Sequence, residues 1–546
     1  MLSRLTRRGL LRLFGAGALA FGSGVLNGCA LPTRSSSMPQ PQTNPSPAFT
    51  PDLDLTIRAV AAEVPILPGT PTRVWTYQAQ VNAGDPAAVQ PIPDSYLGPI
   101  IRVRTGQKVR ITFENKLPDP RQDSIIHWHG LHTPPAMDGH PHTVVRPGER
   151  YVYEFTVTDR AGTYWFHPHP HGQTAQQVIM GLAGLFVVSD PAEDAIGLPG
   201  GEYDLPLVIQ DRTFDADNQF VYDSDPMTRL MGFLGERILV NGRPDLTITA
   251  ATRAYRWRIL NGSNSRIYKL AWDSGMPLTV IATDGGLLEH PLTRPFVMLA
   301  PGERIELWVD LRDIPRDTTL KLVSQPFSGA EGVGMMGESG NMDHGMGGMH
   351  GQMGMMRSGN APPLGAPLDI LQVRVTRQEQ ETLVLPASLI PIQRHRREAA
   401  VNATTPRRIA LSLRGMEWQI NGKTFVMDEV APDEIVRLNT LELWEIVNET
   451  NPGEMMDPMG MAHPIHIHGG QFQIVQRTVL PELRAGWEEV KDGYVDEGWK
   501  DTVLVMPGER VQLLMAFRDY TGMYVYHCHN LEHEDAGMMR NYRIEA

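Results

Sequence analysis

The feature that most constrains this 546-residue chain lies near its C-terminus, at residues 527–538. Three histidines, a cysteine and a methionine occur within these twelve residues, directly after a strand-like run at 522–526. Successive side chains of a strand point to opposite faces. His527 and His529 should therefore face one side and Cys528 the other, so that one short segment serves two sites.

The residue types in this cluster indicate copper. A cysteine, two histidines and a distant methionine form the blue-copper type of electron-transfer site. Cys528, His533 and Met538 supply three of those four ligands. A surface tail with scattered histidines is the alternative explanation, and it fits so dense a cluster poorly. If the site is a copper site, the chain must provide one more histidine on the side of the cysteine.

Four His-x-His pairs are spread along the chain, and this spacing places two imidazoles on one face of an extended segment. One such pair is weak evidence, but four pairs use eight of the 18 histidines. Eight imidazoles suit a cluster of three copper ions, because imidazole is a favoured copper ligand. The pairs are His127 and His129, His167 and His169, His466 and His468, and His527 and His529.

The same alternation predicts the missing ligand on the cysteine side. His466 and His468 share one face of their segment, and His463 has the opposite parity. Cys528 likewise has the opposite parity to its neighbouring histidines. His463 should therefore join Cys528, provided that Pro464 leaves its segment extended.

A repeated turn indicates three related β-modules. The sequence Pro-Gly-Glu-Arg occurs at residues 147–150, 301–304 and 507–510, each time before a strand-like run. A common hairpin turn can arise once by chance, but three copies at comparable points indicate a repeat. Many short strand-like runs, together with 52 glycines and 44 prolines, favour an all-β fold. Polar interruptions predict modules at 51–195, 196–385 and 386–546.

The N-terminus has the features of an export signal. Arg7 and Arg8 resemble a twin-arginine signal, and the uncharged run at 13–26 is too short to span a bilayer. The signal, residues 1–30, ends either at a lipoprotein cysteine, Cys29, or at a cleavage site after Ala30. Residues 31–50 are predicted to be a disordered linker. We therefore expect export to the periplasm or cell envelope, with or without a lipid anchor.

These motifs resemble those of the three-domain multicopper oxidases, which are laccase-like enzymes, and most of all those of the bacterial periplasmic cuprous oxidases. The likeness lies in residues 167–172 with 180–185, in 498–503 and in 531–539, and covers nearly the whole chain after the linker. It implies three cupredoxin-like Greek-key β-sandwiches, four copper ions and oxygen as electron acceptor. The trinuclear site would lie between the first and third modules. The middle module, which lacks a His-x-His pair, would be a structural spacer and a wall for the substrate surface.

The resemblance also implies a role for each ligand. A type 1 copper would be held by His463, Cys528, His533 and Met538, and a type 2 copper by His127 and His466. One type 3 copper would be held by His129, His167 and His529, and the other by His169, His468 and His527. Asp138 and Glu534 match family acids that assist proton delivery, with a turn aspartate and a surface glutamate as the alternatives.

Methionines dominate two further segments. Residues 335–356 hold eight methionines among glycines, and thioether sulfur is a soft ligand that selects Cu(I). The segment is either a loop that collects Cu(I) or a flexible low-complexity insertion at 331–358, late in the second module. In the cuprous oxidases an aspartate and a methionine precede the histidine equivalent to His463, and here a methionine stands at the aspartate position. The candidate Cu(I) ligands are Met335, Met336, Met342, Met346, Met349, Met353, Met355, Met356, Met459 and Met461.

Three functions remain open from the sequence. The first is a Cu(I) oxidase, also acting on Fe(II), that serves copper tolerance. The second is a laccase that oxidises phenols and aromatic amines. The third is a non-catalytic copper-binding relative, which the complete ligand set argues against. The expected partners are oxygen and Cu(I) or a small aromatic reductant; a net charge of -13 argues against nucleic acid. We expect a monomer.

Overall fold

The computed structural model describes residues 42–331, 360–449 and 460–546. The predicted signal sequence lies outside the described residues. So do all eight methionines between residues 335 and 356, and Met459.

The last part of the predicted linker, residues 42–50, departs from the prediction. Gln42 Nε2 donates a hydrogen bond of 2.8 Å to Glu154 Oε2, and the backbone N–H of Ser46 donates to the same carboxylate. The guanidinium of Arg110 also donates to the carbonyl of Phe49 at 2.6 Å. These residues therefore pack on the first module, because its surface offers partners that composition alone does not reveal.

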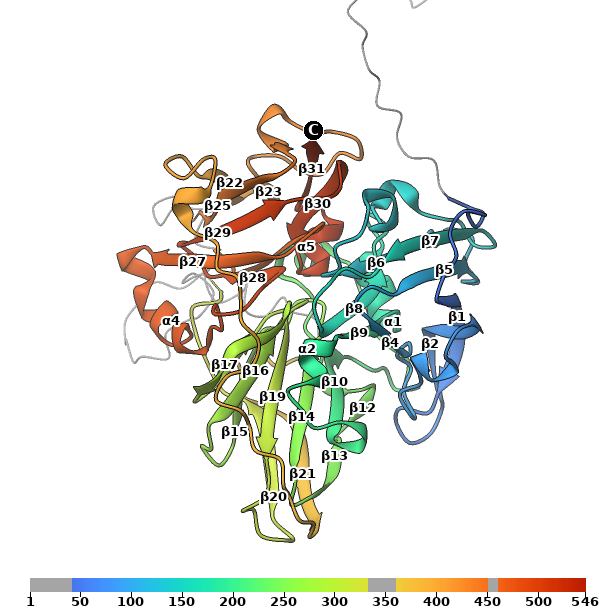
Figure 1. Cartoon of the computed structure of the whole chain (residues 1–546), viewed down its shortest axis with the longest axis vertical. Helices are drawn as coiled ribbons and strands as arrows, with labels where there is room; N and C mark the ends of the chain where they lie inside the picture. The colour runs from blue at the N-terminus through green and yellow to red at the C-terminus, as the bar shows by residue number, and fades with distance from the viewer. Residues whose placement is uncertain (1–41, 332–359, 450–459) are drawn as a thin grey trace, which may run out of the picture. The chain divides into compact units, whose positions relative to one another are not determined.

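The first module, drawn in blue to teal in Figure 1, is a sandwich of two sheets whose apolar side chains meet in one core. Side chains of β5 alternate between buried and more exposed, as expected for a strand with one solvent face. One sheet runs β2 (Thr72–Ala83), β1 (Leu53–Val64), β5 (Lys108–Asn115) and β7 (Arg150–Thr156). The other runs β3 (Val89–Gln90), β4 (Ile100–Arg104), β9 (Gly184–Ser189), β8 (Gly162–Pro168) and β6 (Ile126–His129).

The second module, green to yellow in Figure 1, is also a sandwich of two sheets around its own core. Its larger sheet contains β12 (Arg243–Pro244), β11 (Arg237–Val240), β10 (Asp204–Arg212), β14 (Ala254–Asn261), β19 (Arg304–Asp310), β16 (Leu278–Thr283) and β17 (Gly286–Arg294). Its smaller sheet contains β13 (Thr247–Ala251), β21 (Leu368–Arg377), β20 (Thr319–Ser324), β15 (Tyr268–Trp272) and β18 (Val297–Leu299).

The third module, orange to red, repeats the arrangement. One sheet runs β23 (Glu417–Ile420), β22 (Arg407–Arg414), β25 (Thr440–Asn448), β29 (Glu509–Phe517) and β27 (Phe472–Val479). The other runs β24 (Ile435–Arg437), β31 (Met539–Glu545), β30 (Gly522–Cys528), β26 (His463–Ile467) and β28 (Thr502–Val505). The prediction of an all-β chain built from three sandwiches is confirmed.

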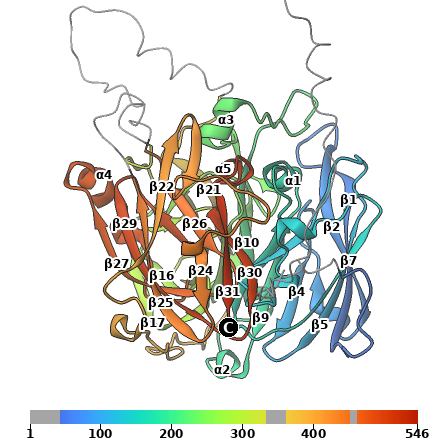
Figure 2. The same ribbon diagram turned by 90° about the horizontal axis from the view of Figure 1, so that it is seen from above.

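Short helices lie where the modules meet. The helices are α1 (Thr174–Met180), α2 (Pro191–Asp194), α3 (Pro226–Met231), α4 (Arg484–Glu488) and α5 (Leu531–Asp535). Figure 2 shows α1, α3 and α5, one from each module, side by side. Ala175 and Val178 of α1 pack against Leu531 of α5. The chain therefore leaves β30, turns into a helix and contacts the other two modules within a few residues of Cys528.

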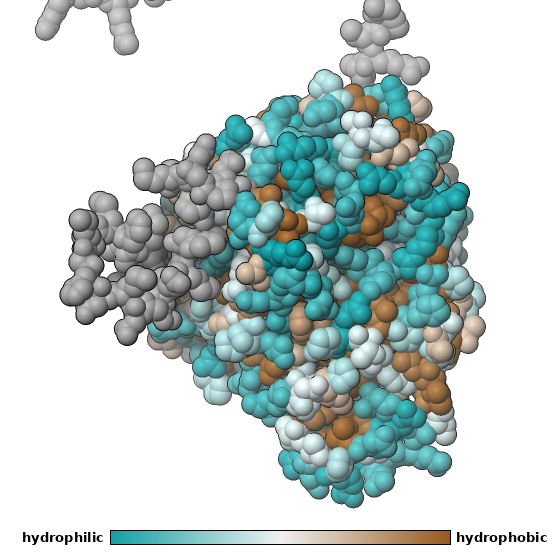
Figure 3. All heavy atoms as spheres, turned by 90° about the vertical axis from the view of Figure 1, so that its left-hand side faces the viewer, coloured by the Kyte–Doolittle hydropathy of each residue, from teal (hydrophilic) through white to brown (hydrophobic). Residues whose placement is uncertain are grey.

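The face of the molecule in Figure 3 is mostly hydrophilic, with small apolar areas scattered across it. This distribution is expected when each sandwich buries its apolar side chains in its own core. None of the helices in the described parts of the chain is long and apolar enough to cross a membrane.

Candidate metal centres

The first candidate metal centre lies at the edge of the third module. His463 begins β26 and Cys528 ends the neighbouring strand β30. His463 Nδ1 lies 3.4 Å from Cys528 Sγ, and His533 Nδ1, from α5, lies 3.6 Å from the same sulfur. Met538 is fully buried, and its carbonyl accepts a 3.0 Å hydrogen bond from the N–H of Cys528. The structure thus brings the sulfur and both histidines of this predicted site together.

His533 has the tautomer that a metal ligand at this centre requires. His533 Nε2–H donates to the carbonyl of Leu230 at 2.9 Å, which leaves its Nδ1 lone pair directed at the sulfur. Burial raises the pKa of the Cys528 thiol. Without a cation the sulfur would stay protonated, whereas a bound metal ion favours the thiolate. The centre therefore has the donor set of a type 1 copper.

The second candidate metal centre lies between the first and third modules, where the eight paired histidines converge from β6, β8, β26 and β30 and the residues directly after them. All eight rings are buried. His127 Nε2 and His466 Nε2 lie 3.3 Å apart. His527 Nε2 lies 3.3 Å from His169 Nε2 and 3.1 Å from His468 Nε2. Two of the three predicted ligand groups are thus each brought to one point.

The remaining ligand group is arranged more loosely. His129 Nδ1 lies 3.4 Å from His167 Nε2. The ring centroid of His529 lies 4.9 Å from that of His129 and 5.3 Å from that of His167. Neither ring nitrogen of His529 has a hydrogen-bond partner within the described ranges. A buried imidazole with two unsatisfied nitrogens is costly, and a metal ion at this point would satisfy one of them.

In several of these rings a hydrogen bond from the outer nitrogen fixes which nitrogen is free to bind. His127 Nδ1–H donates to the carbonyl of Asp138 at 2.7 Å, and His468 Nδ1–H donates to Asp138 Oδ2 at 2.7 Å. His167 Nδ1–H donates to the carbonyl of Pro168 at 2.9 Å. Burial also lowers the pKa of His167 to about 4. Neutral rings with the inner lone pair free are the state that copper binds.

Both predicted proton-delivering acids lie beside this second centre and are buried. Asp138 joins two predicted ligands, because its carbonyl accepts from His127 and its carboxylate accepts from His468. Burial raises the pKa of Asp138 well above its usual range. Glu534 Oε2 lies 3.2 Å from His527 Nδ1, and its Oε1 lies 3.6 Å from His169 Nε2. The alternative of an exposed glutamate does not hold.

Replacing Glu534 by Gln should slow turnover while leaving the blue colour unchanged. The amide keeps the shape of the side chain but cannot carry a proton to the histidine cluster, so we expect a loss of about a hundredfold in kcat. Steady-state oxygen uptake measures the loss, and the visible spectrum serves as the control for the cysteine site. A variant with unchanged kcat across the pH range would remove Glu534 from proton delivery.

Asp501 is a contact of the histidine cluster that sequence reasoning missed. Asp501 Oδ1 accepts a 3.0 Å hydrogen bond from His129 Nε2–H, and its carbonyl accepts from His466 Nδ1–H at 2.8 Å. The hydroxyl of Thr502 lies 3.1 Å from His129 Nε2. In the sequence, residues 498–503 indicate only the family resemblance. The contacts of Asp501 with the histidines arise because β28 pairs with β26, and no local sequence pattern predicts that pairing.

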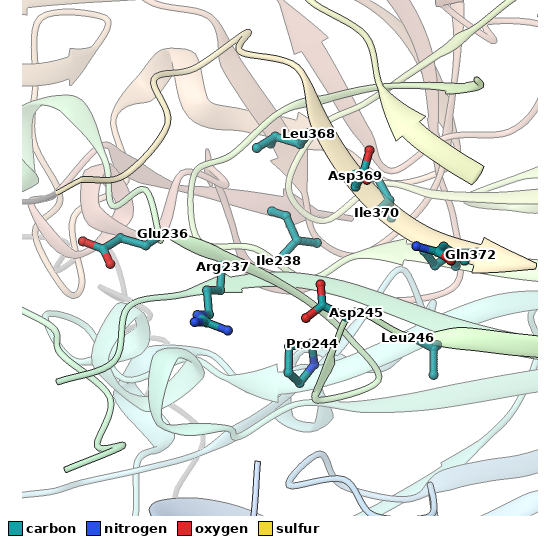
Figure 4. A pocket seen from close by; sticks show the side chains of 11 residues that line it. Glu236, Arg237, Ile238, Pro244, Asp245, Leu246, Leu368, Asp369, Ile370 and Gln372 are labelled. Atoms are coloured by element: carbon teal, nitrogen blue, oxygen red, sulfur yellow. The ribbon is translucent and has the colours of Figure 1, made fainter. Parts of the chain in front are cut away.

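One cavity of the described chain lies away from the metal centres. Figure 4 shows a cavity of about 220 Å³ in the second module, between β11 and β12 of one sheet and β21 of the other. Glu236, Arg237, Asp245 and Asp369 are its charged lining residues, and neither histidine nor cysteine lines it. This cavity therefore offers no ligand to the predicted copper ions.

Comparisons with known proteins identify the class. Multicopper oxidase family models match residues 73–193 and 398–546. The crystal structure of the McoA multicopper oxidase of Aquifex aeolicus is 34% identical, with a TM-score of 0.72, and the match covers 91% of this chain and 97% of that one. A laccase of Bacillus stratosphericus is 29% identical over 520 residues, 86% of this chain and 90% of its own. A multicopper oxidase of Campylobacter jejuni, described as a metallo-oxidase, is 26% identical, with a TM-score of 0.68 and coverage of 93% and 96%.

The chain belongs to the multicopper oxidase family. It is an oxidoreductase that uses copper to pass electrons from a reducing substrate to oxygen. Its three sandwiches are cupredoxin-like, as in its structural relatives. The predicted fold class and family are confirmed.

Proposed function

We propose that this enzyme oxidises Cu(I), and also Fe(II), in the service of copper tolerance, and that it holds four copper ions. The cysteine site would hold one and the histidine cluster three, with the ligands assigned in the sequence analysis. When bound, copper supplies one-electron acceptance at the cysteine site and four-electron reduction of oxygen to water at the cluster.

The chain's own residues give this chemistry its geometry. Cys528 is covalently joined through its neighbouring peptides to His527 and His529, so the shortest route between the two centres is a few bonds of one strand end. Asp138 and Glu534 would hold and deliver the protons that oxygen reduction consumes. Burial of every imidazole excludes bulk water from the cluster.

The Cu(I) proposal rests on the contact between the residues that flank the two methionine-rich segments. Glu331 and Met461 form an isolated antiparallel bridge, and the N–H of Ala462 donates to the carbonyl of Ala330 at 2.8 Å. Glu331, the last described residue before the methionine-rich segment, therefore lies beside Met461, two residues before His463. Met461 is itself buried in the core that contains Cys528. Soft sulfur ligands attached at this point would deliver Cu(I) to the electron-entry site.

A laccase activity on phenols and aromatic amines is the second candidate. It is favoured by the similarity to a laccase over most of both chains. The two candidates differ in what the methionines do, because a thioether-rich segment assists Cu(I) and would only obstruct a bulky phenol.

Steady-state rates on Cu(I) and on a bulky phenol separate the candidates. In one variant residues 335–356 are deleted, and in a second all eight methionines in that range become leucine, which keeps the length and apolar character. We expect both variants to lose roughly tenfold or more in kcat/KM for Cu(I), equivalent to about 1.4 kcal/mol, and to keep or gain activity on the phenol. Full Cu(I) activity in the leucine variant would refute the Cu(I) proposal.

We further propose that the enzyme acts in the periplasm or cell envelope after twin-arginine export, and that Cys29 decides whether it is anchored. The support is the arginine pair and apolar run near the N-terminus. Mass analysis of the mature protein from its own cell envelope would identify either an acylated Cys29 or an N-terminus after Ala30.

A further inference from the structure

The three Pro-Gly-Glu-Arg turns have the same sequence but different surroundings. The first lies on the surface, and a Cβ added to Gly148 would meet nothing within 4 Å among the described residues. In the third turn, an added Cβ at Gly508 would meet the flexible side chain of Leu483. The middle turn, residues 301–304, is buried and faces the histidine cluster. A module predicted to be only a spacer and a substrate wall therefore reaches the oxygen-reducing centre.

Gly302 lies directly against two predicted ligands of one type 3 copper. Its φ is 84°, and an added Cβ would lie 3.1 Å from His129 Cε1 and 3.0 Å from His529 Cδ2. Such distances are shorter than ordinary van der Waals contacts, so a methyl group here would push the rings apart. The glycine thus sets how closely the second module packs on both rings.

Arg304 binds backbone or side-chain oxygens of all three modules. Its Nε–H donates to the carbonyl of Thr163 at 2.9 Å in the first module, and its Nη2 donates to the carbonyl of Asp284 at 3.0 Å in the second. Its Nη1 and Nη2 donate to the two carboxylate oxygens of Asp501 in the third module, at 2.8 and 2.6 Å. The guanidinium is fully buried, so the pair is not weakened by solvent.

Through Asp501 the arginine acts on the ligands. The two parallel hydrogen bonds from the guanidinium hold the Asp501 carboxylate in one orientation. In that orientation Asp501 Oδ1 accepts the Nε2–H of His129, which leaves His129 Nδ1 directed at His167. The carbonyl of the same residue accepts from His466 Nδ1–H, which leaves Nε2 directed at His127. One arginine of the second module therefore orients a ligand from the first and a ligand from the third.

We propose that Gly302 and Arg304 are positioning residues of the histidine cluster, through which the middle module sets the orientation of His129, His466 and His529. The inference rests on the copper-ligand assignment proposed above and is independent of whether the substrate is Cu(I) or a phenol. The two outer turns do not share this role. Arg150 donates to the carbonyl of Thr43 on the surface, and Arg510 is 49% exposed beside Glu445.

The outer turns supply matched control variants. Arg304→Lys keeps the charge but replaces the bidentate fork with a single ammonium group, and Arg150→Lys makes the same change on the surface. Gly302→Ala places a methyl against the rings, and Gly148→Ala, at a φ of 93°, introduces similar backbone strain without a neighbour. Each variant is measured for copper per chain, the type 2 electron paramagnetic resonance signal, the near-ultraviolet absorption of the type 3 pair and the blue absorption of the type 1 site.

We expect Arg304→Lys and Gly302→Ala to weaken copper retention in the histidine cluster by about ten- to a hundredfold, with altered type 2 and type 3 signals. The blue absorption should remain, because the cysteine site lies outside these contacts. The two control variants should match wild type in all four measurements.

Two results would overturn the inference. In the first, both middle-turn variants keep full copper and unaltered type 2 and type 3 signals. In the second, the blue absorption and the cluster signals fall together, in step with a lower melting temperature of the copper-free protein, which would indicate a general structural role. If one middle-turn variant fails to fold, the other is judged by the same two results. A wild-type protein without type 2 and type 3 signals would instead refute the ligand assignment itself.

Discussion

Replacing Cys528 by Ser should abolish the blue colour and reduce oxidase activity to below about 1% of wild type, a loss of more than about 2.7 kcal/mol in transition-state stabilisation. The blue colour requires a thiolate bound to copper, and a hydroxyl oxygen is a harder and less acidic ligand. The same sulfur starts the covalent route to His527 and His529, so its loss also interrupts electron transfer to the cluster. Serine is close to cysteine in volume, and the variant should therefore keep its fold.

The visible spectrum, oxygen uptake and thermal unfolding of the copper-free protein measure these three effects. Met538→Leu is the matched control, because it removes the predicted thioether ligand but keeps the thiolate, and it should keep a blue protein with altered activity. A blue and active Cys528→Ser variant would contradict the assignment of the cysteine site.

Removing copper should lower the melting temperature by roughly 10 °C or more. The histidine cluster is assembled from the first and third modules, so bound copper ties two modules together, as at His127 and His466. A ligand at a thousand times its Kd stabilises the native state by about 4 kcal/mol per site, and each kcal/mol shifts the melting temperature of a domain of this size by about 2–4 °C. Without copper, buried ring nitrogens such as those of His529 are left unsatisfied.

Calorimetry of the holo protein, of the chelated protein and of the reconstituted protein tests this effect. The melting temperature should return when copper is restored. Equal melting temperatures before and after chelation would show that the cluster is preorganised without its metal and that copper contributes little to holding the modules together.

Much of the candidate site could be predicted because a strand has a simple two-residue repeat. The His-x-His spacing and the opposite parity of His463 and Cys528 are local properties of β26 and β30, and adjacent strands keep these faces aligned. The composition and the repeated turn likewise sufficed for the all-β fold and the three modules. These inferences needed no knowledge of how distant parts of the chain meet.

The contacts around the ligands could not be predicted, because they depend on the packing of modules far apart in sequence. Arg304 and Asp501 are separated by almost 200 residues, yet share a bidentate pair. The turn at 301–304 has the same four-residue sequence as the turns at 147–150 and 507–510. The sequence of the turn therefore cannot reveal which copy contacts the histidine cluster. For the same reason the sequence predicts only a spacer and a substrate wall for the middle module.

One short segment of this enzyme, residues 527–538, is expected to join an electron-entry copper site to an oxygen-reducing copper cluster. Copper content and the electron paramagnetic resonance spectrum of the purified protein test it together. We expect four copper ions per chain, with one type 1 and one type 2 signal and with the coupled type 3 pair silent. A chain that binds copper without a type 1 signal, or whose every copper ion is visible in the spectrum, would contradict it.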